Sequence, residues 1–155
     1  MIKNLFIQYL SDTDDDFPVP DYETPGSSGL DIRAYLTKEE RSFGKVLMPG
    51  QRLLIPTGFK IEMPCGYEGQ IRSRSGLALQ FGIGLANGVG TIDSDYRGPL
   101  GVIMMNWGSA PYTIKHSQRI AQLVIVKYTR VKLKVVKDLS RTVRNDSGFG
   151  STGNF

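Results

Sequence analysis

The amino-acid sequence predicts an all-β fold, a barrel or jelly roll with one short helix. Apolar segments recur in about a dozen short runs, too short for helices, and turns rich in glycine and proline separate them. The chain holds 18 Gly and 8 Pro. Only residues 75–80 combine a capping residue with good helix formers. Residues 141–155 are rich in glycine, as a flexible tail is.

Composition limits the class of protein. A chain of 155 residues suits one domain with one core. The net charge of +4 would suit an anionic partner, but Lys and Arg are spread along the chain, so phosphorylated small molecules fit as well as nucleic acid. The single cysteine, Cys65, cannot form an intrachain disulfide, and the N-terminal residues show neither the longer apolar run nor the small-residue cleavage site of a signal peptide. No apolar run approaches the ~18 residues that span a bilayer, so we expect a soluble, cytoplasmic protein without a membrane partner.

The N-terminal segments predict two strands and a loop. Residues 2–10 alternate well enough for a first strand. The acidic run at 11–16 lacks the glycine turn and terminal glutamate of a calcium loop, so we expect a solvated loop there. Residues 27–36 turn into a second strand, which presents Asp31 and Arg33 on its polar side. The apolar side of that strand consists of Leu30, Ile32 and Ala34.

The middle of the chain predicts short strands at 45–61 and then the helix, with Ser75 as its N-cap. Arg72 and Arg74 flank the start of this helix. A helix N-terminus presents unpaired N–H groups and a partial positive charge, so this segment outlines a phosphate site. A plain capped helix with two solvated arginines is an equal alternative.

A glycine-punctuated hairpin at 84–90 leads into a short strand at 91–92. Glycines let the backbone approach a flat ligand, and Asp93, at the end of the strand, is held rigidly enough to activate water. Three further functional side chains follow at Asp95, Tyr96 and Arg97. Local composition alone favours a simpler interpretation, an ordinary hairpin with a solvated turn.

Two apolar strands are predicted at 100–107 and 119–126. The second is interrupted by Gln122, and a buried amide needs partners, so we expect this side chain to face a polar group. His116 stands alone on a turn between the strands. We expect it to be a surface residue and not a catalyst.

The C-terminal segment begins with alternating basic and apolar residues at 130–135, which predict a strand with a solvated cationic edge. No aromatic residues interleave there, so a nucleic-acid stripe is disfavoured. Further on, the ring of Phe149 could cover a base, while Arg144 and the hydroxyl groups of Ser151 and Thr152 could meet phosphates. A disordered terminus is the equal alternative.

Five segments of the chain closely resemble, in order, the five motifs of the trimeric dUTP pyrophosphatase (dUTPase) family. The segments are GLDIRA at 29–34, RSGLA at 74–78, residues 87–98, RIAQL at 119–123, and Arg144 with GFGSTG at 148–153. The resemblance implies a jelly-roll or distorted-barrel domain over residues 1–143 and a C-terminal arm over 144–155. It also implies a homotrimer in which each active site draws on all three chains and the arm closes over a neighbour's site.

The same resemblance implies hydrolysis of dUTP to dUMP and pyrophosphate, with Mg²⁺ on the triphosphate. This reaction keeps uracil out of DNA and supplies dUMP for thymidylate synthesis. Asp93 matches the general base that activates the attacking water. Tyr96 matches the ring that packs against deoxyribose and leaves no space for a 2′-hydroxyl group. Asn87, Thr91 and Ile92 match the edge that reads uracil.

The remaining motif residues match groups that hold the triphosphate. Those expected to contact phosphates are Arg74, Ser75, Gly76 and Gln122. Asp31 matches an acid that would hold Mg²⁺ through water. The closing arm contributes Arg144, Phe149, Gly150, Ser151 and Thr152, with the ring of Phe149 on uracil and the other residues on the β- and γ-phosphates.

Several positions depart from the family pattern. Ser117-Gln118 stands where Gly-Asp is usual, Pro99 replaces a frequent acid, and residues 144–148 are poor in glycine. None of these changes removes a catalytic side chain. A dCTP deaminase of the same fold would need a glutamate to work on the base, and release of ammonia from dCTP would reveal it. A regulatory binding protein on the same scaffold is the other alternative, but the chain shows no long insertion.

Overall fold

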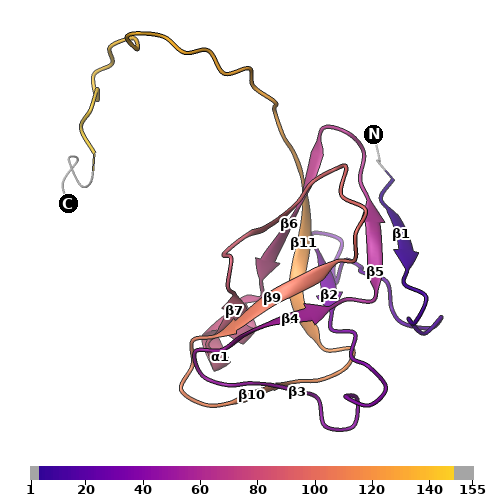
Figure 1. Cartoon of the computed structure of the whole chain (residues 1–155). Coiled ribbons are helices and arrows are strands. Elements are labelled where there is room, and N and C mark those ends of the chain that lie inside the picture. The colour runs from indigo at the N-terminus through magenta and orange to yellow at the C-terminus, as the bar shows by residue number, and fades with distance from the viewer. Residues whose placement is uncertain (1–3, 149–155) are drawn as a thin grey trace.

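The computed structural model of the chain describes residues 4–148. This part of the chain forms eleven β-strands and one α-helix (Figure 1). In chain order they are β1 (Phe6–Tyr9), β2 (Gly29–Arg33), β3 (Lys45–Leu47), β4 (Arg52–Pro56), β5 (Phe59–Glu62), β6 (Tyr67–Ser73), α1 (Ser75–Phe81), β7 (Ile83–Leu85), β8 (Gly90–Ile92), β9 (Gly101–Asn106), β10 (Tyr112–Ile114) and β11 (Arg119–Lys127).

Every strand pairing in this part of the chain is antiparallel, and most pair strands that are far apart in sequence. The largest sheet has the order β2-β11-β6-β8, and a second sheet has the order β4-β9-β7. Two further pairs, β1-β5 and β10-β3, flank them. Figure 1 shows the strands wrapped around a common interior. The all-β jelly-roll fold predicted from the sequence is therefore confirmed.

The core fills the space between the sheets, and side chains reach it from alternate positions of the strands. In β9, for example, Val102 and Met104 are buried, whereas Ile103 between them is exposed. The largest fully buried side chains are Phe59, Ile32, Leu36, Leu47, Ile55, Ile83, Leu100, Met104, Ile114, Ile120, Leu123 and Val102. No helix within residues 4–148 is long and apolar enough to cross a membrane.

The predicted helix is present as α1, but the prediction of its N-cap is wrong. The N-cap is Arg74, in an extended conformation (φ −88°, ψ 126°), and it makes no side-chain capping bond. Strand β6 ends at Ser73, so a single residue joins strand to helix and Ser75 is already helical. The helix ends at Phe81 and is capped by Gly82, whose φ of 67° is left-handed and whose N–H group donates to the carbonyl of Ala78.

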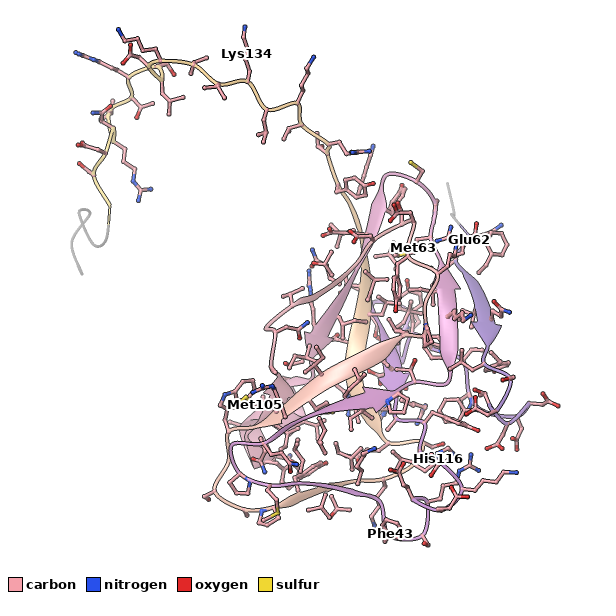
Figure 2. All side chains as sticks on the ribbon, in the orientation of Figure 1. Phe43, Glu62, Met63, Met105, His116 and Lys134 are labelled. Atoms are coloured by element: carbon pink, nitrogen blue, oxygen red, sulfur yellow. The ribbon has the colours of Figure 1, made fainter. Side chains whose placement is uncertain are left out.

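The strand predicted at 130–135 is also wrong. The chain after β11 is extended but unpaired, and Figure 1 shows it leading away from the body of the subunit. The side chain of Val135 is fully exposed, and Lys134, labelled in Figure 2, lies on the same segment. Alternating sequence makes a strand only where a neighbouring strand can pair with it, and this subunit offers none to that segment.

Candidate active site

A cavity of about 390 Å³ lies where β2, β11 and the start of α1 meet. Its lining residues are polar or charged, apart from two glycines: Glu23, Ser27, Ser28, Gly29, Asp31, Arg74, Ser75, Gly76, Arg119 and Gln122. The structure thus brings together in one cavity the predicted residues Asp31, Arg74, Ser75, Gly76 and Gln122. We refer to it below as the charged cavity.

Strand register explains why residues so distant in sequence meet in the charged cavity. Asp31 of β2 is the direct partner of Gln122 of β11. The Nε2 atom of Gln122 donates a 3.1 Å hydrogen bond to the carbonyl of Ser73, the last residue of β6, which confirms that its side chain faces a polar group. A Cβ atom at Gly29 would lie 2.6 Å from Oε1 of Gln122, so a side chain there would displace this amide group.

The charges of the charged cavity are paired across four segments of the chain. The Oδ2 atom of Asp31 accepts a 3.0 Å hydrogen bond from Nη1 of Arg119, and its Oδ1 atom lies 3.6 Å from Nε of Arg74. The same Nη1 atom of Arg119 is 2.8 Å from Oε2 of Glu23. The hydrogen bond to Glu23 raises the pKa of Arg119 above its ordinary value, so this guanidinium stays charged. Arg74 also donates a 3.0 Å hydrogen bond to the carbonyl of Arg119, which ties the two arginines together.

The start of α1 opens onto the charged cavity. N–H groups in the first turn of a helix have no acceptor within the helix, and Ser75 and Gly76 occupy that turn. A Cβ atom at Gly76 would meet nothing within 4 Å in this chain, so Gly76 borders open space at the entrance of the charged cavity. With two guanidinium groups nearby, these N–H groups can bind an anion such as a phosphate.

A second cavity, of about 440 Å³, lies beside β8, β4 and β9. It is lined by Leu54, Pro56, Thr91, Ile92, Asp93, Tyr96, Pro99, Leu100, Gly101 and Ile103. It contains the predicted residues Thr91, Ile92, Asp93 and Tyr96 over a mostly apolar wall. We call it the apolar cavity, and its composition suits an apolar ring with a few polar edges.

The turn after β8 positions the functional groups of the apolar cavity. β8 pairs with β6 and ends at Ile92, so Asp93 follows a fixed strand and its side chain is exposed. The N–H group of Tyr96 then donates a 3.1 Å hydrogen bond to the carbonyl of Asp93, which closes the turn. The hydroxyl group of Tyr96 donates to the carbonyl of Pro99 at 3.0 Å, so its ring is held at the cavity wall.

Asn87 lines neither cavity. It lies exposed in the turn between β7 and β8, and a Cβ atom on Gly90 would be 3.2 Å from its Nδ2 atom. The amide group therefore lies over the backbone of the hairpin, at the end away from Asp93. In a single subunit the structure does not bring it to the other predicted residues.

The two cavities share no lining residue. The predicted base, Asp93, and the predicted phosphate-contacting residue Ser75 therefore belong to different cavities of the same chain. Within residues 4–148 no group of three or more His, Cys, Asp or Glu side chains could hold a metal ion.

The C-terminal predictions fall largely outside the described residues. Arg144 is exposed, and its Nε atom donates a 3.0 Å hydrogen bond to the carbonyl of Ser147, within its own segment. It lines neither cavity. Phe149, Gly150, Ser151 and Thr152 lie outside the described part of the chain.

His116 is not the surface residue that was predicted. Its Nδ1 atom accepts a 3.1 Å hydrogen bond from the N–H group of Leu36, and its ring centre lies 5.3 Å from those of Phe17 and Tyr35. The residue is half-buried in the loop between β10 and β11 (Figure 2). It lines neither cavity, so the expectation that it is no catalyst is consistent with its position.

Sequence reasoning missed two charged residues of the charged cavity, Glu23 and Arg119. Arg119 begins the fourth motif, but nothing in the local pattern indicated that its side chain would meet Asp31. Glu23 lies in a proline-rich segment without periodicity. The bridge between Asp21 and Asp31 places that segment against β2, and only the folded chain reveals it.

Comparison with known proteins decides the family. The dUTPase family model matches residues 15–153. The chain belongs to the dUTPase family. It is 49% identical over 153 residues to the deoxyuridine 5'-triphosphate nucleotidohydrolase of Roseobacter denitrificans, covering 98% of this chain and 97% of that protein. The corresponding protein of Caldanaerobacter subterraneus subsp. tengcongensis is 50% identical over 138 residues, or 89% of this chain and 90% of the other.

Solved structures of dUTPases share the fold. The dUTPase of Staphylococcus bacteriophage 80alpha with dUpNHpp superposes with a TM-score of 0.83 at 26% identity and covers 97% of this chain and 98% of that one. The dUTPase of the S. aureus phage phi11 reaches a TM-score of 0.74 at 23% identity, over 90% and 99% of the two chains. The latter likeness concerns the fold alone.

Proposed function

We propose that this dUTPase hydrolyses dUTP to dUMP and pyrophosphate through water activated by Asp93. The observation that carries the proposal is the pairing of an apolar cavity that suits a nucleoside with a charged cavity that suits phosphates. The names of its relatives support the same substrate. The reaction keeps uracil out of DNA and supplies dUMP for thymidylate synthesis.

The apolar cavity holds the nucleoside. The uracil ring lies against the β8 hairpin, where Thr91 and Ile92 present a narrow edge. Asn87, which lines neither cavity of a single subunit, would supply a polar group from the turn of the same hairpin in the assembled site. The ring of Tyr96 packs against deoxyribose and excludes a 2′-hydroxyl group. Asp93 takes a proton from a water molecule as the water oxygen bonds to the α-phosphorus. The bond from the α-phosphorus to the bridging oxygen breaks, and pyrophosphate leaves.

The charged cavity holds the phosphates. The N–H groups of Ser75 and Gly76 and the hydroxyl group of Ser75 donate to phosphate oxygens, and Arg74 adds a charged contact. Gln122 is held beside them by its bond to Ser73. Because these donors are in place before the substrate binds, they can stabilise negative charge as it develops.

The residues present fit Mg²⁺ bound through water. Both oxygens of Asp31 already have guanidinium neighbours, at 3.0 Å and 3.6 Å, which leaves little room for direct coordination. A hydrated Mg²⁺ is commonly held by one or two carboxylates and by substrate phosphates, so Asp31 would hold it through water while the triphosphate supplies most ligands. The ion would neutralise phosphate charge.

We further propose a homotrimer with shared active sites. Asp93 and Ser75 line different cavities of one chain, so a complete site needs the apolar cavity of one subunit and the charged cavity of another. The arm, residues 144–155, would close over the bound nucleotide from a neighbouring barrel of residues 1–143. Arg144, Phe149, Gly150, Ser151 and Thr152 would then contact uracil and the outer phosphates. The enzyme would act in the cytoplasm on free nucleotide, with neither nucleic acid nor membrane as a partner.

Subunit complementation tests this proposal. Asp93→Asn and Arg74→Ala chains, each inactive alone, are co-expressed with different tags, and mixed trimers are purified. If each site takes its base from one subunit and its phosphate contacts from another, one site in three is intact in every mixed trimer, whether it holds two copies of one variant or of the other. We expect about a third of wild-type activity. Mixed trimers that stay as inactive as the parent variants would show that both residues act within one subunit.

A further inference from the structure

Glu23 faces the charged cavity, yet the proposed reaction assigns it no role. A turn holds it there: the N–H group of Ser27 donates to the carbonyl of Thr24 at 3.0 Å, and the two hydroxyl groups lie 2.9 Å apart. The N–H group of Asp31 donates to the carbonyl of Asp21 at 2.9 Å and fixes this turn to β2. The carboxylate of Glu23 therefore stands on a built wall of the cavity.

Glu23 and Asp31 compete for one guanidinium nitrogen. The Nη1 atom of Arg119 is 2.8 Å from Glu23 and 3.0 Å from Asp31. The side chain of Asp31 is only 13% exposed, whereas that of Glu23 is 52% exposed. Glu23 is thus the outer carboxylate, which an entering anion meets first and can displace from Arg119.

Glu23 also sets the charge of the cavity. The charged side chains that line it are Glu23, Asp31, Arg74 and Arg119, so two negative charges cancel two positive ones. A metal-free triphosphate carries several negative charges and is repelled by an exposed carboxylate at the entrance. A triphosphate with bound Mg²⁺ carries two fewer, and the cation attracts the same carboxylate. Without Glu23, the cavity would carry one net positive charge and would bind either form of the anion.

We propose that Glu23 is a specificity-determining residue that makes the charged cavity favour magnesium-complexed over metal-free polyphosphate. The inference rests on the proposed phosphate-binding role of this cavity. It concerns the form of the nucleotide that binds and not the chemical step, so Glu23 is not a catalytic residue.

The test measures binding of α,β-imido-dUTP in the presence of Mg²⁺ and in EDTA, with Glu23→Gln, Glu23→Asp and a control. The quantity compared is the ratio of the dissociation constant in EDTA to that in Mg²⁺, which we expect to exceed one in the wild-type enzyme. We expect Glu23→Gln to lower this ratio about tenfold, mainly through tighter metal-free binding. Glu23→Asp retains the charge and should retain the ratio. The control, Glu40→Gln, removes a carboxylate that is paired with Lys45 at 3.0 Å and lines neither cavity.

Two results would overturn the inference. An unchanged ratio in Glu23→Gln, including one in which both forms of the nucleotide bind equally more weakly, would show that Glu23 only stabilises the cavity wall. A Glu23→Asp variant that behaves like Glu23→Gln would show that charge is not the determinant. Arg74→Gln tests separately whether the charged cavity binds the phosphates. If this variant leaves the affinities for both forms of the nucleotide unchanged, the proposed phosphate-binding role of the cavity is wrong.

Discussion

The hydroxyl group of Tyr96 donates a 3.0 Å hydrogen bond to the main-chain carbonyl of Pro99, and the ring lies directly over Gly98 between them. A Cβ atom on Gly98 would overlap that hydroxyl group. The absence of a side chain at this one position therefore leaves the space that the ring proposed to face deoxyribose occupies. Pro99 replaces the acid frequent in the family, but the bond uses its carbonyl and so does not depend on the side chain.

Gly98→Ala should weaken the discrimination between dUTP and UTP. The added methyl group displaces the ring of Tyr96, so the space denied to a 2′-hydroxyl group opens. We expect the ratio of kcat/KM for dUTP over UTP to fall about tenfold, as the loss of one steric contact allows. Pyrophosphate release with each nucleotide measures it. Gly26→Ala is the control, because Gly26 also lies in a turn and has no positive φ, but a Cβ atom there would meet no atom within 4 Å. A normal ratio in Gly98→Ala would show that the ring of Tyr96 does not exclude the 2′-hydroxyl group.

Asp93→Asn should retain nucleotide binding and lose turnover. The amide has the size of the carboxylate but cannot accept the proton of the attacking water. A positioned general base commonly accelerates a reaction ~10²–10⁴-fold, so kcat should fall at least about 100-fold. Single-turnover kinetics and binding of α,β-imido-dUTP separate the two effects. Asp95→Asn, two residues along the same turn, is the matched control, and equal losses in both variants would argue against a special role for Asp93.

Removal of residues 145–155 should cripple turnover while the trimer persists. The barrel that the structure describes keeps both cavities without these residues. If the arm closes over the nucleotide as proposed, its removal takes away hydrogen-bond donors that stabilise the transition state. We therefore expect kcat/KM to fall about 100-fold or more. Steady-state kinetics and analytical ultracentrifugation report on the two properties. Wild-type turnover by the truncated chain would show that the arm has no part in the reaction.

The free energy of unfolding should fall as the pH drops below neutrality, because of His116. Burial, followed by the charge of Arg41, lowers the pKa of this histidine in the folded chain. In the unfolded chain this histidine has a pKa of about 6.5. Between that pKa and the lower pKa of the folded chain, the unfolded chain binds more protons, so the free energy of unfolding decreases as the pH falls through this interval. Above about pH 7.5 both states are neutral and the contribution is complete.

Denaturant titrations between about pH 5 and 8 measure this dependence. The chain contains one histidine, so the effect can be assigned to it. His116→Gln should be less stable at the alkaline end, since its contacts with Leu36 and the neighbouring rings change, but its stability should vary less with pH over that range. An equal slope in the variant and the wild type would assign the pH dependence to other groups.

Sequence patterns predicted the fold well because they report which residues share a face. The strands predicted at 119–126 and within 27–36 appear as β11 and β2, and Ile32 is buried between the less buried Asp31 and Arg33, as the alternation predicts. The same reasoning failed at 130–135, since alternation does not say whether a neighbouring strand exists. It also misassigned the cap at Ser75, because the residue type suggested an N-cap but β6 extends to Ser73 and moves the cap to Arg74.

The candidate site was predicted in its parts but not in its arrangement. Ordered motifs identified the side chains, and strand register then placed Asp31 opposite Gln122. The separation of Asp93 from Ser75 depends on the path of the chain between the sheets, which local patterns do not encode. Glu23 escaped notice for a related reason: its ion pair with Arg119 joins segments almost one hundred positions apart, at 2.8 Å.

Ser117→Gly should stabilise the fold. Ser117 has a φ of 60°, in the left-handed region, where the family usually has glycine. The N–H group of Ser117 donates to Ala34 and its carbonyl accepts from Arg33, so neighbours impose this backbone conformation. Glycine relieves about 1–2 kcal/mol of strain, and the greater freedom of glycine in the unfolded chain offsets roughly 0.5–1 kcal/mol.

The net gain should be about 1 kcal/mol, or a rise in Tm of about 2–4 °C for a chain of this size. Differential scanning calorimetry measures it. Ser117→Ala is the matched control, because alanine also lacks the hydroxyl group but keeps the Cβ atom, and it should gain nothing. If alanine and glycine stabilised equally, the effect would come from the hydroxyl group and not from the backbone conformation at this position.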